Sequence, residues 1–164
     1  MARSNNHLKA SAYLPVLYRL TLLVLEPLSA LNGAVMTFRT PRDYVTRITH
    51  NARLYEPANQ FLYTQLGGAW LLFAFNEAVV MWLVDDLRVW KLLCCGMLIS
   101  DVVYHVSSVQ AVGGWEVYRR LGEWNAFDWA VWASAVGPMV VRLLVVFEVG
   151  VKRDVTKRIK GEGE

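Results

Sequence analysis

The chain contains little charge and almost no cysteine. Asp, Glu, Lys and Arg make up only 19% of its 164 residues, whereas soluble domains carry about 25%. The two cysteines, Cys94 and Cys95, are neighbours in an apolar run, so they cannot link distant segments, and we expect two inert thiols. These shortages exclude a disulfide-rich secreted domain and argue against a soluble one.

Motifs that hold cofactors are also missing. The sequence has no His/Cys/carboxylate set with metal-ligand spacing, no glycine-rich phosphate loop and no nucleophile elbow. We therefore expect no metal and no organic cofactor. The net charge of +3 comes mostly from basic residues at the ends of apolar runs. They suit membrane topology and lipid headgroups, so we do not expect nucleic acid as a partner.

Apolar residues make up 55% of the chain, and they are bunched into four runs. Each run is long enough to cross a bilayer, which takes about 20 residues. Because irregular backbone cannot face lipid, we predict helices. The sequence thus predicts a single all-α domain over 1–164, an antiparallel up-down four-helix bundle integral to the membrane, with a polar tail at 152–164. The expected spans are Leu14–Phe38, Phe61–Val84, Leu87–Val109 and Ala126–Val149.

The basic residues also predict an orientation. Four spans place both termini on one side, and more Lys and Arg flank the spans on that side than on the other. The positive-inside rule then puts both termini in the cytosol and the loop Arg39–Gln60 on the lumenal face. We expect a multi-pass protein of the endoplasmic reticulum.

Ionisable residues inside the spans form two predicted layers. Arg19, Glu77 and Arg142 lie roughly 8–11 Å from the cytosolic ends at about 1.5 Å per residue. Glu77 is expected to pair with Arg142 or Arg19, either as a structural ion pair or as part of an anion clamp for a substrate headgroup. Glu26 and Asp101 lie deeper, roughly 18–21 Å in, with no cation at their depth. Each is either a protonated structural acid or a catalytic general acid.

The third span carries a polar stripe. Asp101, Tyr104, His105 and Ser108 have the spacing of one helix face, so they are expected to face the bundle interior. Asp101 is placed to orient the ring of His105, which makes His105 a catalytic candidate. The alternative is that these polar groups only join helices.

The start of the fourth span allows two interpretations. Asn125 can cap the helix, with Asp128 in its first turn. Alternatively, Asn125 and Asp128 reach inward toward His105 and line a pocket mouth, which makes Asp128 a catalytic candidate. Asn32 and Tyr104 are further substrate-binding candidates. Trp124 is another, although the tryptophans here also suit an interfacial belt.

Several runs resemble a family of small fungal four-span membrane proteins. The likeness extends roughly from Leu14 to Val149 and includes the runs Leu25-Glu26-Pro27-Leu28-Ser29-Ala30, Asn76-Glu77-Ala78, Asp86-Leu87-Arg88-Val89-Trp90, Leu98-Ile99-Ser100-Asp101 and Trp124-Asn125 with Asp128-Trp129. Some members belong to secondary-metabolite gene clusters. They include a membrane-bound terpene cyclase of the ascofuranone type and epoxide hydrolases of polyene-pyrone pathways.

The resemblance implies that this chain opens a substrate epoxide with water or an internal hydroxyl. One departure is in the third span, where many members have a His-Leu-Tyr-Ser-like run. Here the run is Val103-Tyr104-His105-Val106-Ser107, which leaves the roles of Tyr104 and His105 open.

The leading hypothesis is therefore a membrane-embedded epoxide hydrolase or cyclase that acts on a lipophilic polyketide or terpenoid. One of Glu26 and Asp101 would donate a proton, and the other, with His105 or Asp128, would activate the nucleophile. The rivals are a non-catalytic lipid- or sterol-binding protein and a small proton-coupled exporter. Membrane lipid is an expected partner in each case, and a homodimer stays open.

Overall fold

The computed structural model describes residues 8–151. The polar tail predicted at 152–164, and Arg3 among the basic residues used for orientation, lie outside this range. Within it, four helical stretches are long and apolar enough to cross a membrane, and the prediction of four spans is confirmed. They are Val16–Arg39, Pro57–Leu83, Leu87–Ala111 and Ala126–Val146, so each boundary lies within a few residues of its expected position.

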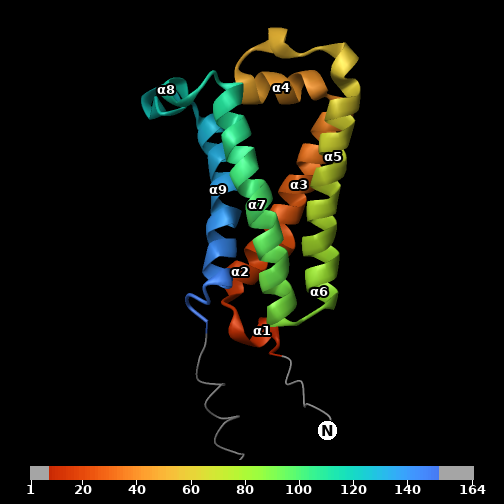
Figure 1. Cartoon of the computed structure of the whole chain (residues 1–164), viewed down its shortest axis with the longest axis vertical. Coiled ribbons are helices and arrows are strands. Elements are labelled where there is room, and N and C mark those ends of the chain that lie inside the picture. Colours follow the sequence, from red (N-terminus) through yellow and green to blue (C-terminus); the bar gives the residue numbers. More distant parts are fainter. Residues whose placement is uncertain (1–7, 152–164) are drawn as a thin grey trace, which may run out of the picture.

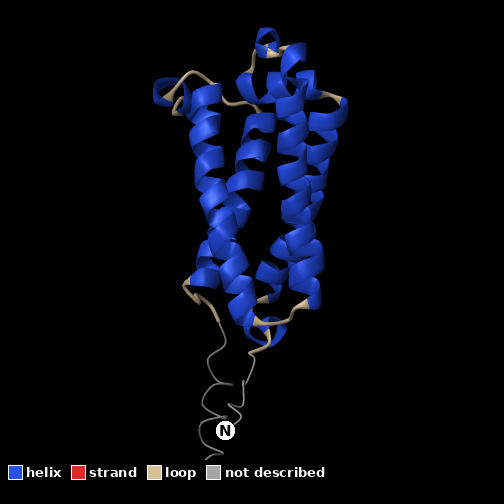
Figure 2. Cartoon of the chain, turned by 45° about the vertical axis from the view of Figure 1, so that its right-hand side comes forward, coloured by secondary structure: helices blue, strands red, loops and turns tan. Residues whose placement is uncertain are grey.

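The described residues form helices and connecting turns without a strand, which confirms the all-α class (Figure 2). The first span joins α2 (Val16–Leu20), a π-helical turn (Thr21–Leu25) and α3 (Glu26–Arg39). The second joins a 3₁₀ turn (Pro57–Asn59), α5 (Gln60–Phe75), a second π-helical turn (Asn76–Val80) and α6 (Met81–Leu83). The third is α7 (Leu87–Ala111) and the fourth is α9 (Ala126–Val146). The first and last described segments lie at the same end of the bundle (Figure 1).

The distribution of polarity is that of a membrane protein. Large apolar side chains of α7 point outward, with Leu92 73% and Ile99 71% exposed. In contrast, Glu77 and Arg142 are completely buried. A soluble fold buries its apolar side chains and exposes its charges, whereas this arrangement suits lipid as the surrounding solvent. The chain is therefore a multi-pass membrane protein.

Small residues allow the first two spans to approach closely. Gly67 of α5 is buried against α3, and a Cβ at this position would lie 2.7 Å from Thr37 Oγ1 and 2.6 Å from Phe38 Cζ. Glycine is therefore required for the contact between α3 and α5, as is common between membrane helices. These helices form one side of the bundle, and α7 and α9 form the other (Figure 1).

Most of the long connection Arg39–Gln60, expected as a loop, is helical. The helix α4 (Pro41–Thr49) lies across the end of the bundle, opposite the chain's described termini (Figure 1). It buries Pro41 and Val45 and ends at His50, whose φ of 54° is left-handed. A short helix, α8 (Trp115–Tyr118), and a 3₁₀ turn (Leu121–Glu123) follow α7 at the same end.

The opposite end is closed by a tight turn between the second and third spans. Asp86 caps α7 by accepting hydrogen bonds from the main-chain N–H of Arg88 (2.8 Å) and Val89 (3.3 Å). Asp85 accepts from the main-chain N–H of Ser11 (2.7 Å), which fixes α1 (Ala10–Tyr13) beneath the bundle. The short turn makes the second and third spans antiparallel neighbours, as expected.

Candidate functional site

Arg142 of α9 is the centre of a buried charged cluster. Its Nη1 donates to Asp101 Oδ2 at 2.5 Å, and its Nη2 donates to Glu77 Oε1 at 2.9 Å. Nη2 also donates to Glu26 Oε1. The guanidinium lies over the ring of Phe73, 5.5 Å from its centroid. One cation thus joins carboxyl groups from the first three spans to the fourth, and the predicted Glu77–Arg142 pair is confirmed.

The prediction of two separate layers is wrong. Glu26 and Asp101 were expected to have no cation, yet both contact Arg142. Counting rise along each helix locates the Cα atoms, but an arginine side chain reaches several ångströms beyond its own turn. Arg19 does not join the cluster: its Nε is buried and has no hydrogen-bond partner in the described part of the chain.

Helix irregularities position the acids. Glu26 follows the π-helical turn Thr21–Leu25 directly and precedes Pro27, which has no N–H to continue an α-helical ladder. Glu77 lies inside the second π-helical turn. Pro138, also buried, lies one turn before Arg142 in α9. Each π-helical turn adds one residue to the helix, which rotates the side chains that follow it, and such turns are frequent at functional sites.

Glu26 and Asp101 line one partly open cavity between the helices, which we call the inner cavity, and the prediction that they share a cavity is confirmed. Its volume is about 480 Å³, and its walls are mostly apolar, which is the size and character of a site for a small lipophilic molecule. Side chains and main chain of α3, α4, α5, α7 and α9 contribute to it, among them Trp70, Phe73 and Phe127. Glu77 does not line this inner cavity, so its carboxyl group is enclosed by the bundle while the other two acids face the space.

Two of the predicted substrate-binding residues, Asn32 and Tyr104, also line the inner cavity. Tyr44 of α4 lies there too and was missed, because the segment that carries it was taken for a loop. Burial raises the pKa of the Tyr44 hydroxyl well above its ordinary value, so this group is a neutral hydrogen-bond donor. Pro41 after Thr40, with Asp43 in the first turn, was the available sign of a helix start.

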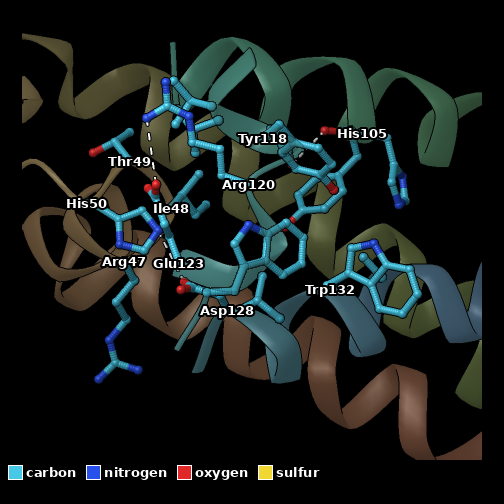
Figure 3. A pocket seen from close by; sticks show the side chains of 17 residues that line it. Arg47, Ile48, Thr49, His50, His105, Tyr118, Arg120, Glu123, Asp128 and Trp132 are labelled. Carbon is cyan, nitrogen blue, oxygen red and sulfur yellow. Dashed lines mark hydrogen bonds and ion pairs between the residues drawn. The ribbon is translucent and has the colours of Figure 1, made fainter. Parts of the chain in front are cut away.

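A second, outer cavity of about 400 Å³ is lined by residues of α4, α7, α8 and α9 and of the turns beside them. Figure 3 shows the side chains that line it. His105, Asp128 and Trp124 line this outer cavity and not the inner one. The two cavities share Arg47, Ile48, Tyr104, Val131 and Ala135. The prediction that His105 and Asp128 lie toward one mouth is consistent with this placement, and their catalytic roles stay predictions.

The ring of His105 is held differently from the prediction. Its Nδ1 bonds the main-chain carbonyl of Asp101 at 2.8 Å, whereas the Asp101 carboxylate bonds Arg142. Because residues four apart in a helix are neighbours, the ring of His105 can reach either the main-chain carbonyl or the side chain of Asp101. The Asp101 carboxylate already accepts a hydrogen bond from Arg142. The stripe on α7 nevertheless faces the cavities: Asp101 lines the inner one, Ser108 the outer one and Tyr104 both.

Asn125 caps α9, so the first of its two interpretations is confirmed. Its Oδ1 accepts from the main-chain N–H of Phe127 (2.8 Å) and Asp128 (3.1 Å), while Asp128 accepts in return from the N–H of Asn125 (2.8 Å). Asn125 does not line either cavity. Asp128 completes the cap and also lines the outer cavity, where its Oδ1 lies 3.1 Å from His50 Nε2.

Fold and site together define a four-span membrane protein with a buried charged cluster beside a mainly apolar cavity. The chain matches the family model described as a domain of unknown function, DUF7704, over residues 11–152 and belongs to that family. Comparison with curated proteins finds no match. Comparison with solved structures finds none either.

Proposed function

We propose that this protein is a membrane-embedded enzyme that opens an epoxide of a lipophilic polyketide or terpenoid, as a hydrolase or a cyclase. The observation that carries the proposal is the pair of acids, Glu26 and Asp101, on one mainly apolar cavity and on one guanidinium. A hydrophobic substrate partitions into such a site, where exclusion of water strengthens proton transfer and suppresses side reactions.

The hydrogen bonds of Arg142 suggest different roles for the two acids. Glu26 and Glu77 share one nitrogen, Nη2, while Asp101 has Nη1. Glu26 Oε2 and Glu77 Oε2 are both buried, and neither has a hydrogen-bond partner among residues 8–151. Two adjacent carboxylates around one positive group repel each other, and a proton retained by the pair relieves this repulsion. Since only Glu26 of this pair lines the cavity, we assign the general acid to Glu26.

Glu26 and Asp101 together account for both proton transfers of the proposed reaction. The carboxylic acid of Glu26 gives its proton to the epoxide oxygen as the C–O bond breaks. The oxygen of a water or of an internal hydroxyl forms the new C–O bond and releases its proton to the carboxylate of Asp101. The product is a diol or a cyclic ether, and return of the proton from Asp101 to Glu26 restores the site. Each proton transfer is expected to contribute about 10²–10⁴ in rate.

Turnover of purified variants tests the proposal. We expect Glu26→Gln and Asp101→Asn, reconstituted in nanodiscs, to lose at least a hundredfold in epoxide opening, about the contribution of one proton transfer. Both amides keep the shape of the acid and can still accept a hydrogen bond from Arg142, so we expect both variants to fold. The matched control is Glu148→Gln, at the end of the bundle where Glu148 pairs with Lys91 at 2.6 Å, and it should act like wild type. Wild-type rates in both cavity variants would exclude this chemistry.

A non-catalytic lipid- or sterol-binding protein is the second candidate. It is favoured by the fact that Glu26, Glu77 and Asp101 each contact Arg142, which is also how a purely structural cluster would satisfy its charges. In that case the cavity binds an apolar ligand and neither amide variant changes its affinity. A proton-coupled exporter would instead show proton-driven flux in sealed vesicles that depends on Glu26.

A further inference from the structure

Arg19 of α2 is a cation inside a membrane span that has no anion beside it. It lies close to the start of the first span, Val16–Arg39. Its side chain is half-buried, and among residues 8–151 no carboxyl group pairs with it and no acceptor takes a hydrogen bond from it. A guanidinium is always charged, and a charged group in a span is costly unless it finds a partner. The bilayer itself is one source of such a partner.

The part of Arg19 that remains open is the tip of its guanidinium. Nε is buried, whereas Nη1 and Nη2 are not among the buried atoms that lack a partner. Side chains of a helix lean toward its N-terminus, which for α2 is the end of the bundle with the described termini (Figure 1). Long basic side chains near a helix end extend to the polar surface of the bilayer. We therefore expect Nη1 and Nη2 to reach the headgroup layer of that leaflet.

A basic run of the sequence starts beside the same helix. The hydroxyl of Tyr18, the neighbour of Arg19, donates to the main-chain carbonyl of Val149 at 3.3 Å. Val151 packs against the apolar core, so the chain is held against α2 just before segment 152–160 begins. That segment contains five Lys or Arg residues and one Asp. A basic segment directly after a span is typical of proteins that bind anionic lipid headgroups.

The acidic residues described at this end are engaged elsewhere. Glu148 pairs with Lys91 at 2.6 Å, Asp85 accepts from the main-chain N–H of Ser11 at 2.7 Å, and Asp86 caps α7. The anion that a bilayer supplies at this depth is a lipid phosphate. A guanidinium suits a phosphate especially well, because two of its N–H groups can donate to two phosphate oxygens.

We propose that Arg19 binds the phosphate of an anionic phospholipid in the leaflet at this end of the bundle. Nη1 and Nη2 donate to the phosphate, and the basic run 152–160 favours headgroups that carry no positive charge of their own. The acyl chains of the lipid lie along α2, where Val16, Leu17 and Leu20 are exposed. This site is independent of the proposed enzymatic function and of both cavities.

Competition between two lipids that differ only in the headgroup alcohol tests the site. The full chain, delipidated in detergent, is mixed with equal amounts of phosphatidylglycerol and phosphatidylcholine that carry the same acyl chains, and native mass spectrometry counts the bound lipids. We expect wild type to prefer phosphatidylglycerol. Arg19→Leu should lower this preference roughly fivefold, the contribution of one basic side chain near an anionic headgroup. Arg19→Lys should keep part of it, since lysine retains the charge but cannot bind two oxygens in the same way.

Arg42→Leu is the matched control, because Arg42 is exposed on α4 at the opposite end and its loss changes the net charge equally. It should keep the wild-type preference. Equal binding of both lipids to wild type, an undiminished preference in Arg19→Leu, or an equal loss in Arg42→Leu overturns the site. The wild-type comparison needs no variant, so a poorly folded Arg19→Leu protein does not block the test. A preference that added inorganic phosphate abolishes would indicate a site for a soluble anion and would also overturn the proposal.

Discussion

Arg142 is the side chain on which carboxyl groups of three spans converge, and its removal would leave all of them without a cation. It is completely buried, as is Glu77. Breaking a buried ion pair from one side costs roughly 3–5 kcal/mol, because the remaining charge has no compensation. We predict that Arg142→Leu lowers the yield and the thermal midpoint of the purified protein strongly.

Arg19→Leu is the matched control for this prediction, because Arg19 also lies in a span but has no ion pair in the described structure. Its effect on the midpoint in the same detergent should be much smaller. Equal losses in the two variants would show that Arg142 does not hold the cluster together.

The composition of this cluster illustrates what the sequence could and could not predict. Glu77 was predicted to pair with Arg142 or Arg19, since all three lie at a similar number of residues from the same bundle end, and the structure pairs it with Arg142. Glu26 and Asp101 were separated from Arg142 by the same arithmetic, which takes no account of side-chain length or helix tilt. The π-helical turns beside Glu26 and Glu77 were not predictable from apolar periodicity, because a single inserted residue leaves an almost uniformly apolar run unchanged.

At the scale of elements, the contact between α3 and α5 depends on one glycine. Gly67→Ala would push its Cβ against Thr37, which is buried, and Phe38. Overpacking of this kind costs about 1–3 kcal/mol. We predict a lower thermal midpoint for Gly67→Ala. Gly68→Ala is the control, since a Cβ there meets no atom within 4 Å, and a loss as large as that of Gly67→Ala would contradict the close approach.

The element that sequence reasoning missed is α4. The four spans were recognisable because each is a long apolar run, and the capping residues Asn125 and Asp128 have a recognisable spacing. The helix α4 is short and amphipathic, so only its start signal and the spacing of Val45 and Ile48 pointed to it. As a result, Tyr44 and His50, which line the two cavities, were absent from the predicted site.

At the scale of the whole molecule, the described chain begins and ends at one end of the bundle, and α4 covers the other (Figure 1). The positive-inside rule predicts that the end with the termini is cytosolic. A C-terminal tag should therefore be digested by protease added to sealed microsomes. Protection of the tag would show that the orientation is the opposite one, with the outer cavity on the cytosolic side.

The proposed chemistry depends most on one property of the buried cluster, a proton that the Glu26–Glu77 pair holds inside the membrane. The most direct test is the infrared spectrum of the protein in nanodiscs at neutral pH. We predict the carbonyl stretch of a protonated carboxylic acid in wild type and in Glu148→Gln. This band should disappear in Glu26→Gln and in Glu77→Gln, because either change removes the repulsion that retains the proton. A wild-type spectrum without the band, or a band that both cluster variants keep, would contradict the claim.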